Sequence, residues 1–360
     1  MHTSHEKRRV GILGATGMVG QQYLSLLEGH PWFTVTHLVA SPSSAGKTYA
    51  EAVEGRWHMA GSVPEVAKKL IVHTVDDLDA VMKNCDFVFS ALDSDIAKVW
   101  EEKYAAAGIP VVSNASTHRM TPDVPMIIPE VNPDHMEMIK IQQKNRGWSK
   151  GFIVVKPNCS IQSYVAPLAA LHRKFTVKNI VVTTMQAISG AGHPGVASLD
   201  ILENVIPLIQ GEEVKSEKEP QKIFGSIKGN AIAHNESIII SAHCNRVPTI
   251  DGHMACVSFS CEKMPTDTEI LAAWTAFKGP PQDLDLPFAP KQAITYLTET
   301  NRPQPRIDRN RDKGMTVTVG RLREDPVFQW KFVGLSHNTI RGAAGGGILI
   351  AELLKAKSYV

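Results

Sequence analysis

A glycine-rich turn close to the start of the sequence does most to limit the fold of this chain. Residues 9–13 (RVGIL) are apolar enough to form a buried strand, and leucines recur at helical spacing over residues 17–28. The turn that joins them, residues 14–20 (GATGMVG), places glycines at GxxGxxG spacing. Such a turn lets the backbone approach a pyrophosphate, which rests on the N-terminus of the following helix. It therefore predicts a Rossmann-type sheet that binds a dinucleotide.

Strands and helices alternate through roughly the first 150 residues, which is typical of a doubly wound parallel sheet. Beyond the first unit, the pattern predicts strands at residues 33–40, 70–75, 86–92, 110–115, 126–129 and 151–155. It predicts helices at residues 77–83, 95–107 and 132–144. We expect residues 55–69 to form an irregular surface insertion.

Longer strands with alternating polarity follow a helix predicted at residues 160–172. They are expected at residues 178–187, 237–243, 253–262, 315–323 and 328–335, with one clear helix at 269–277. This pattern favours a mainly antiparallel sheet with helices on one face. We therefore predict an α/β fold with a Rossmann-type nucleotide domain (1–157), an α+β domain (158–337) and a C-terminal helix (338–360) that returns to the first domain.

The loop after the second strand favours NADP over NAD. NAD sites usually place a carboxylate at the end of this strand to bind the ribose 2′-hydroxyl. Here the strand is followed by Ser41, Ser43, Ser44 and Lys47, and residues 40–47 contain no carboxylate. Hydroxyls, backbone N–H groups and a lysine suit a 2′-phosphate. The alternative is a solvated serine loop.

Composition excludes several classes of function. A formal net charge of +2 gives no reason to expect nucleic acid or a membrane as partner. No apolar run approaches the roughly 18 residues that span a bilayer, and the N-terminus leaves no room for a signal peptide before the first strand. Five cysteines, few and odd in number, suit free thiols in a reducing compartment. We therefore expect a cytoplasmic location.

A metal site is not expected. Cys244, Cys256 and Cys261 lie near His243 and His253, which could suggest zinc. However, these residues lack close CxxC spacing and fall on alternating strand patterns, so we predict no metal.

Cys159 is the strongest candidate for a nucleophile. The predicted strand at residues 151–155 stops before Pro157, and the helical pattern begins at Ser160. Cys159 is therefore expected at a helix N-terminus, where unpaired backbone N–H groups stabilise a thiolate. The alternative is a small buried side chain, because free cysteines are often buried.

A series of motifs in this order resembles the aspartate-β-semialdehyde dehydrogenases, and the resemblance covers nearly the whole chain. Pro157 before Asn158-Cys159 and Ser160 after it are similar to the archaeal and fungal branch. The motifs are GxxGxxG at 14–20, SNAS at 113–116 with Arg119-Met120, PEVN at 129–132, PNCS at 157–160, QAISGAG at 186–192, Glu219 with Lys222, RVP at 246–248 with Gly252-His253, and NTIRGAA at 338–344.

The resemblance implies reductive dephosphorylation of L-aspartyl-4-phosphate to L-aspartate-4-semialdehyde, with NADPH as hydride donor. Cys159 would form a thioacyl intermediate, His253 would act as acid and base, and Gln186 would orient the acyl group. The substrate residues implied are Arg246 for the α-carboxylate, Glu219 for the α-ammonium group, Lys222 and Arg119 for the phosphate, and Asn158 beside the nucleophile. A homodimer or homotetramer is also implied.

The turn, the serine loop and the resemblance together give the expected cofactor contacts. They are Gly14, Thr16, Gly17, Met18, Val19, Gly20, Ser41, Ser43, Ser44, Lys47, Ser90, Ala91, Leu92, Ser189, Gly190 and Asn338. One departure weakens the choice of NADP: this branch often has an arginine where Ser43 stands.

Alternatives stay open at this point. The run at residues 212–219 (EEVKSEKE) is also typical of a solvated charged segment, in which Glu219 would have no ligand. An acyl-CoA reductase of the malonyl-CoA reductase type also needs a nucleophilic cysteine and an arginine. N-acetyl-glutamyl-phosphate reductase uses the same chemistry but has no free α-ammonium group to bind. A nucleotide-binding regulator that has lost catalysis is the alternative from another class.

Overall fold

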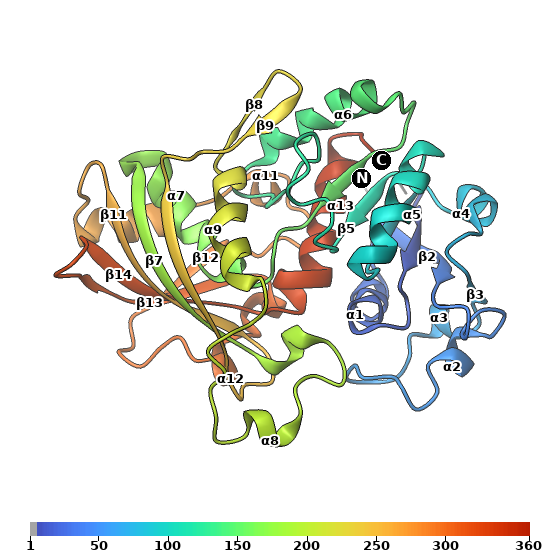
Figure 1. Cartoon of the computed structure of the whole chain (residues 1–360), viewed down its shortest axis with the longest axis horizontal. Helices are drawn as coiled ribbons and strands as arrows, with labels where there is room; N and C mark the ends of the chain where they lie inside the picture. The colour runs from blue at the N-terminus through green and yellow to red at the C-terminus, as the bar shows by residue number, and fades with distance from the viewer. Residues whose placement is uncertain (1–5) are drawn as a thin grey trace.

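Two six-stranded sheets lie side by side in the computed structural model, which describes residues 6–360 (Figure 1). In the first sheet every pairing is parallel, and the strand order is β3-β2-β1-β4-β5-β6. This is the order of a Rossmann fold, so the predicted first sheet is confirmed. Its strands are β1 (Arg8–Leu13), β2 (Phe33–Val39), β3 (Val72–His73), β4 (Phe87–Ser90), β5 (Val111–Ser113) and β6 (Ile153–Val155).

Helices connect these strands, as right-handed parallel crossovers require. The first begins at Met18, directly after the glycine-rich turn, so that turn joins the end of β1 to a helix start. The helices of this half are α1 (Met18–Leu27), α2 (Tyr49–Ala52), α3 (Glu65–Lys68), α4 (Leu78–Asn84), α5 (Ser94–Ala106) and α6 (Met138–Arg146).

Two expectations for this half are wrong in detail. Residues 126–129 form no strand; Met126 makes a single bridge to Val155. The side chain of Asn132 takes the place of a neighbouring strand, because its Oδ1 accepts from Ile128 N and its Nδ2 donates to Met126 O. The segment expected to be irregular at residues 55–69 contains the short helix α3.

The second sheet is mixed, with the order β10-β7-β11-β14-β13-β12. The β10–β7 and β12–β13 pairs are parallel, and the three central pairings are antiparallel. The expected mainly antiparallel sheet is therefore confirmed, with parallel strands at both edges. Its strands are β7 (Val177–Gln186), β10 (Ile239–Arg246), β11 (His253–Cys261), β12 (Ile294–Leu297), β13 (Val317–Glu324) and β14 (Trp330–Ser336), and a separate hairpin is formed by β8 (Ser226–Lys228) and β9 (Ala231–Ala233).

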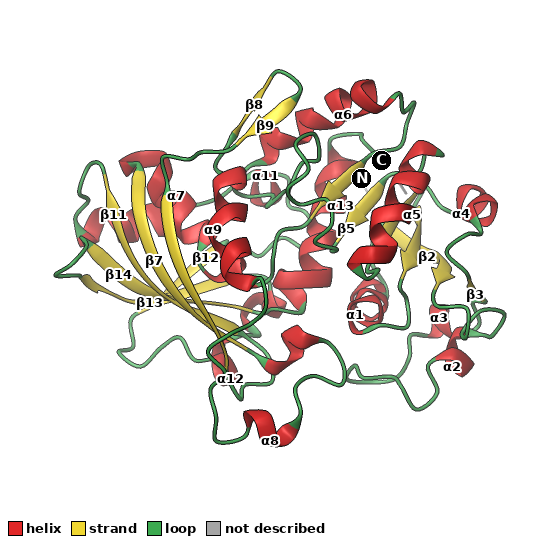
Figure 2. Ribbon diagram, viewed as in Figure 1, coloured by secondary structure: helices red, strands yellow, loops and turns green. Residues whose placement is uncertain are grey.

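More helices accompany this sheet than the two predicted at residues 160–172 and 269–277 (Figure 2). Alternate residues of β11 are buried, and Trp274 of α10 packs edge-on against Phe332 of β14 in the same core. The helices are α7 (Val165–Phe175), α8 (Ser198–Ile201), α9 (Glu212–Ile223), α10 (Asp267–Thr275), α11 (Pro280–Asp283) and α12 (Pro305–Asp308). No helix within residues 6–360 is both long and apolar enough to cross a membrane.

The helix expected at residues 160–172 is broken. A 3₁₀ turn covers Ser160–Ser163, the backbone leaves the helical region at Tyr164, and α7 runs from there to Phe175. Hydroxyl groups satisfy the backbone of the first turn: Ser163 Oγ donates to Ser160 O at 2.7 Å. Cys159 therefore precedes a single 3₁₀ turn and not an α-helix.

The C-terminal segment crosses from the second sheet back to the first. A π-helical turn at Ile340–Ala344 leads into α13 (Gly345–Ala356). Side chains of α13 from Ile348 to Leu354 share one apolar core with β1, β2 and α1. Residues around 338–344 are thereby held at the junction of the two sheets.

Candidate active site

A cavity of about 650 Å³ lies at the junction of the two sheets. Leu92 and Asn114 reach it from the carboxyl ends of β4 and β5, where parallel sheets bind their ligands. Cys159, Ser189 and Asn338 line it from the other side. Groups from both halves of the chain therefore face one space.

The glycine-rich turn has the shape that a dinucleotide requires. Gly14 has φ +81°, and a Cβ there would lie 2.5 Å from the carbonyl oxygen of Ala91. A Cβ at Gly20 would overlap the carbonyl oxygen of Gly14. No side chain caps the N-terminus of α1, so its first N–H groups are open to a phosphate. The segment that contains Thr16 and Gly17 thus fits a pyrophosphate.

Several of the predicted cofactor contacts lie on the cavity wall. Asn338 is held in place twice, because its Oδ1 accepts from Gly252 N and its Nδ2 donates to Ser189 Oγ, both at 2.8 Å. The arrangement leaves a polar edge beside Cys159, as a nicotinamide amide needs. The predicted contacts on this wall are Met18, Val19, Leu92, Ser189, Gly190 and Asn338.

The serine loop after β2 is only partly open. Ser41, Ser43 and Lys47 are exposed, and Lys47 Nζ donates to Ser43 O at 3.0 Å. Ser44 and Ser90 are fully buried, so their side chains do not fit the cofactor contacts predicted for them. The reason is local packing: Ser44 Oγ accepts from Arg56, and Ser90, the last residue of β4, is paired with Leu13 of β1 and Ser113 of β5.

Cys159 and His253 form a close pair at the inner end of the cavity. Cys159 Sγ lies 3.4 Å from His253 Nε2, and His253, the first residue of β11, is fully buried. The backbone N–H of Ala187 donates to His253 Nδ1 at 3.0 Å. Because a backbone N–H can only donate, Nδ1 carries no proton. The proton of neutral His253 therefore sits on Nε2 and points at the sulfur.

Burial controls the protonation of both groups. Burial, followed by the charge of Arg246, lowers the pKa of His253 to about 3. Burial, followed by the charge of Glu212, raises the pKa of the Cys159 thiol, while Lys156 acts in the opposite direction. The predicted stabilisation of the thiolate by a helix N-terminus is wrong, because a four-residue 3₁₀ turn replaces that helix and burial dominates. The resting pair is a neutral thiol and a neutral imidazole.

Gln186 and Arg246 end the neighbouring parallel strands β7 and β10 and are paired in register. Arg246 Nη1 donates to Ala187 O at 2.8 Å, and Gln186 Nε2 donates to Glu212 Oε2 at 3.3 Å. Both side chains are buried just behind the cavity wall. Gly190 lies against Arg246, since a Cβ at that position would be 2.9 Å from Arg246 Nη1.

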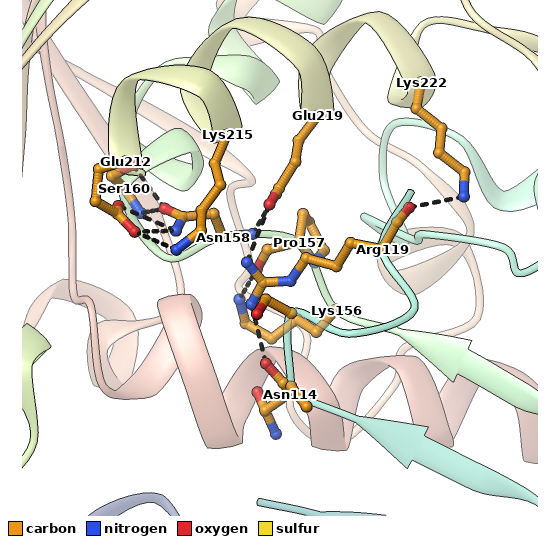
Figure 3. Close-up of polar contacts among 12 residues, drawn as sticks. Asn114, Arg119, Lys156, Pro157, Asn158, Ser160, Glu212, Lys215, Glu219 and Lys222 are labelled. Atoms are coloured by element: carbon orange, nitrogen blue, oxygen red, sulfur yellow. Dashed lines mark hydrogen bonds and ion pairs between the residues drawn. The ribbon is translucent and has the colours of Figure 1, made fainter. Parts of the chain in front are cut away.

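The inward face of α9 carries charges in two matching pairs (Figure 3). Glu212 and Lys215 line the cavity and bond to each other at 2.9 Å. Both oxygens of Glu212 also accept from Asn158 Nδ2 at 3.0 Å. Reasoning from the sequence missed Glu212 and Lys215, because the charged run was interpreted as solvated. The signal was present: ExxK occurs at 212–215 and again at 219–222, which places all four residues on one helix face.

Glu219 and Lys222 belong to the second pair and do not reach the cavity wall. Glu219 is 2% exposed, and its oxygens accept from Arg119 Nη1 at 3.0 Å and Asn158 N at 2.6 Å. Lys222 is fully buried, and its Nζ donates to three backbone carbonyls. The predicted ligand roles of Glu219 and Lys222 therefore do not fit this structure, since their polar atoms are already bonded within the protein.

Arg119 and Asn158 do face the cavity, as predicted for substrate residues. Arg119 Nη2 donates to Asn114 O at 2.9 Å, and its buried Nε has no hydrogen-bond partner among the described residues. Asn158 Oδ1 accepts from Ser160 N and from Ser160 Oγ. A fixed guanidinium with an unpaired donor is suited to bind an anion.

The histidines and cysteines that were weighed as a zinc site, and set aside, form no such cluster in the described structure. Within residues 6–360, no group of three or more His, Cys, Asp or Glu side chains has the arrangement of a metal site. All five cysteines are free thiols.

Known proteins similar to this chain cover almost its whole length. Residues 9–139 match the family described as semialdehyde dehydrogenase, NAD binding domain, and residues 168–341 match its dimerisation domain. An aspartate-semialdehyde dehydrogenase of Archaeoglobus fulgidus is 47% identical over 96% of this chain and 97% of its own length. This chain belongs to the aspartate-semialdehyde dehydrogenase family. The family predicted from the sequence motifs is thus confirmed.

Two further members of the family support this. The aspartate-semialdehyde dehydrogenase of Schizosaccharomyces pombe is 44% identical, over 98% of this chain and 99% of that protein. The crystal structure of the Candida albicans enzyme with NADP superposes with a TM-score of 0.90 at 41% identity, and covers 99% of this chain and 100% of that one. Both the α/β fold and its division into a parallel and a mainly antiparallel sheet are shared with that enzyme.

Proposed function

We propose that this chain reduces L-aspartyl-4-phosphate to L-aspartate-4-semialdehyde with NADPH, through a thioacyl intermediate on Cys159. The observation that carries this proposal is the pair of Cys159 Sγ and His253 Nε2, 3.4 Å apart, in a cavity that also has a dinucleotide-shaped turn. The similar Candida albicans enzyme was crystallised with NADP. The product would feed the biosynthesis of threonine, methionine and, in some organisms, lysine.

The first half of the reaction makes a thioester. The sulfur of Cys159 attacks the acyl carbon, the C–O bond to phosphate breaks, and the thiol proton leaves with the phosphate. Arg119 and Lys215, which both line the cavity, are placed to bind the phosphate and stabilise its departure. His253 donates its Nε2–H toward the sulfur, which favours the thiolate.

The second half releases the aldehyde. Bound NADPH supplies a hydride to the thioester carbon. His253 donates a hydrogen bond from Nε2–H to the oxygen that becomes negative. As the carbonyl re-forms and the C–S bond breaks, the released thiolate takes a proton from water. Gln186, fixed at the end of β7, is placed to orient the acyl group through its amide.

The amino-acid end of the substrate would lie between Arg246 and Glu212. Arg246, which lies just behind the cavity wall, is proposed to bind the α-carboxylate, and Glu212, which lines the cavity, takes the ammonium role that the sequence suggested for Glu219. An ammonium group beside Glu212 would offset the negative charge that helps to raise the pKa of Cys159. Substrate binding would therefore promote ionisation of the nucleophile.

The position of Glu212 favours this substrate over the alternatives. N-acetyl-glutamyl-phosphate and malonyl-CoA have no free ammonium group for a carboxylate on the cavity wall. Lys47, Ser41 and Ser43 are the exposed groups that would bind the 2′-phosphate of NADP. We also propose a homodimer or homotetramer built on the dimerisation region at residues 168–341, and a cytoplasmic location in keeping with the five free thiols.

A spectrophotometric assay at about 340 nm tests the proposal, because reduced nicotinamide absorbs there. Wild-type protein with L-aspartate semialdehyde, phosphate and NADP should form NADPH, and NAD should support a slower rate. Malonyl-CoA with NADPH should give no turnover. Absence of phosphate-dependent NADPH formation, or faster oxidation of NADPH by malonyl-CoA, would refute the assignment. Cys159→Ala should abolish turnover and still bind NADP, as measured by calorimetry.

A further inference from the structure

The second ExxK pair of α9 lies directly behind the cavity and has no task in the reaction described above. Glu219 and Lys222 follow Glu212 and Lys215 by seven residues, which is two helical turns, so they project from the same face (Figure 3). Buried charges of this kind are costly unless they are paired and fully hydrogen-bonded. Their partners therefore indicate what they do.

Glu219 joins two functional segments. Its Oε1 accepts from Arg119 Nη1 at 3.0 Å, and its Oε2 accepts from the backbone N–H of Asn158 at 2.6 Å. Arg119 comes from the loop after β5 of the first sheet, and Asn158 directly precedes the nucleophile. One carboxylate thus fixes both the proposed phosphate ligand and the backbone next to Cys159.

Lys222 holds the same loop by its backbone. Nζ donates to the carbonyl oxygens of Arg119 at 2.7 Å, Thr121 at 2.7 Å and Val124 at 2.8 Å. An ammonium group has three donors, so these contacts use its whole capacity. The loop at residues 119–124 is therefore attached to α9 at three successive points, and it can bring Arg119 to the cavity in only one orientation.

The guanidinium of Arg119 shows the result of this attachment. Glu219 and the carbonyl of Asn114 fix Nη1 and Nη2, while the buried Nε has no hydrogen-bond partner among residues 6–360. A donor that is buried, unpaired and rigidly directed is preorganised for an anion.

We propose that Glu219 and Lys222 are positioning residues that preorganise Arg119 for the phosphate group and hold its loop to the helix that carries Glu212 and Lys215. This inference rests on the proposed phosphate-dependent reaction. It predicts that the second pair sets phosphate affinity and contributes little to binding of the cofactor or the amino-acid end of the substrate.

Glu219→Gln is the direct test, because glutamine keeps the size and an acceptor for Asn158 N but loses the charge that pairs with Arg119. We expect the KM for phosphate to rise about tenfold, with the KM for semialdehyde and for NADP changed by less than about twofold. Glu213→Gln on the same helix is the matched control and should leave all three unchanged. Lys222→Met should resemble Glu219→Gln, with exposed Lys218→Met as its control.

A second readout does not depend on turnover. Phosphate should slow the alkylation of Cys159 by iodoacetamide. Peptide mass spectrometry measures this alkylation, and the exposed Cys256 serves as internal reference. The phosphate concentration that gives half-maximal protection, called the midpoint, should rise about tenfold in Glu219→Gln. Adding Glu219→Gln to Arg119→Lys should not raise the midpoint above that of Arg119→Lys alone, because Glu219 acts through Arg119. An unchanged midpoint, or an equal rise in the Arg119→Lys background, would overturn the proposal.

The outcomes separate the two proposals. If wild-type protein shows no semialdehyde turnover but phosphate still protects Cys159, the proposed function fails and the positioning role is still tested by the alkylation midpoints. If both Glu219→Gln and Lys222→Met lose their folded circular-dichroism signal, the pair is purely structural and the positioning role is overturned.

Discussion

Substitution of Gly190 by alanine should impair catalysis without unfolding the protein. A Cβ at this position would lie 3.0 Å from both Cε1 and Nε2 of His253 and 2.9 Å from Nη1 of Arg246, whereas ordinary Cβ contacts lie at 3.4–4 Å. The backbone of Gly190 is not in the left-handed region, so alanine itself is not strained there. The perturbation is therefore confined to the contact with His253 and Arg246.

The size of the effect follows from how His253 is held. Its Nδ1 is bonded to Ala187 N at 3.0 Å and its Nε2 faces Cys159 Sγ at 3.4 Å, so a push on the ring changes both distances. Relief of the overlap requires a shift of about 0.5 Å, and misplacement by 1 Å typically costs about 100-fold in rate. We therefore expect kcat to fall about tenfold, equivalent to about 1.4 kcal/mol of activation free energy.

The assay is NADPH formation at saturating semialdehyde and phosphate, together with thermal unfolding by circular dichroism. The free energy of unfolding should change by less than about 1 kcal/mol, because Gly190 is exposed, in the 3₁₀ turn at Ile188–Ala191. Ala191→Ser, the exposed neighbour, is the control and should keep wild-type kcat. A Gly190→Ala enzyme with kcat within about twofold of wild type would refute the reasoning on His253 geometry.

Two further predictions concern stability. Arg341→Met should destabilise the fold by about 3–5 kcal/mol in urea unfolding. The guanidinium of Arg341 donates to the two oxygens of Glu130 at 2.7 and 3.0 Å, and its loss leaves Glu130 as an unpaired buried charge. A loss of stability below about 1 kcal/mol would contradict this. Burial raises the pKa of Glu352 to about 8, so between pH 6.5 and 8 the folded protein holds a proton that the unfolded chain has released. Stability should therefore fall with rising pH by up to about 1.4 kcal/mol per pH unit, and Glu352→Gln should remove that loss. Burial lowers the pKa of neighbouring His30 to about 4, so His30 makes stability rise with pH, but only below its unfolded pKa of 6.5. If the free energy of unfolding depends on pH equally in Glu352→Gln and wild type above pH 6.5, the prediction is contradicted.

Much of the fold could be predicted because local pattern and tertiary structure agree. The glycine-rich turn predicts a strand that is followed directly by a closely packed helix, and β1 and α1 lie where it predicts them. The pattern failed where side chains replaced backbone partners. Residues 126–129 are apolar like a strand, but Asn132 supplies their hydrogen bonds. Side chains likewise bond at the 3₁₀ turn that was expected to be an α-helix, where Ser160 Oγ donates to Asn158 Oδ1 and Ser163 Oγ donates to Ser160 O.

The site was predictable where residue chemistry is specific. Cys159 and His253 were singled out from the sequence and lie together. Glu212 and Lys215 were missed because a charged helix face is usually solvated, and polarity alone does not reveal which face points inward. Only the tertiary structure distinguishes the two ExxK pairs, since they have the same spacing and differ in what lies opposite them: a cavity for the first, and the loop at residues 119–124 for the second.

The thioacyl bond on Cys159 is the central claim, and mass spectrometry tests it most directly. Enzyme mixed with L-aspartate semialdehyde and NADP, but without phosphate, should release a burst of about one NADPH per chain and then stall. The peptide containing Cys159 should then carry one aspartyl group, which added phosphate should remove. A burst with no adduct on that peptide, or undiminished turnover in Cys159→Ser, would contradict the account.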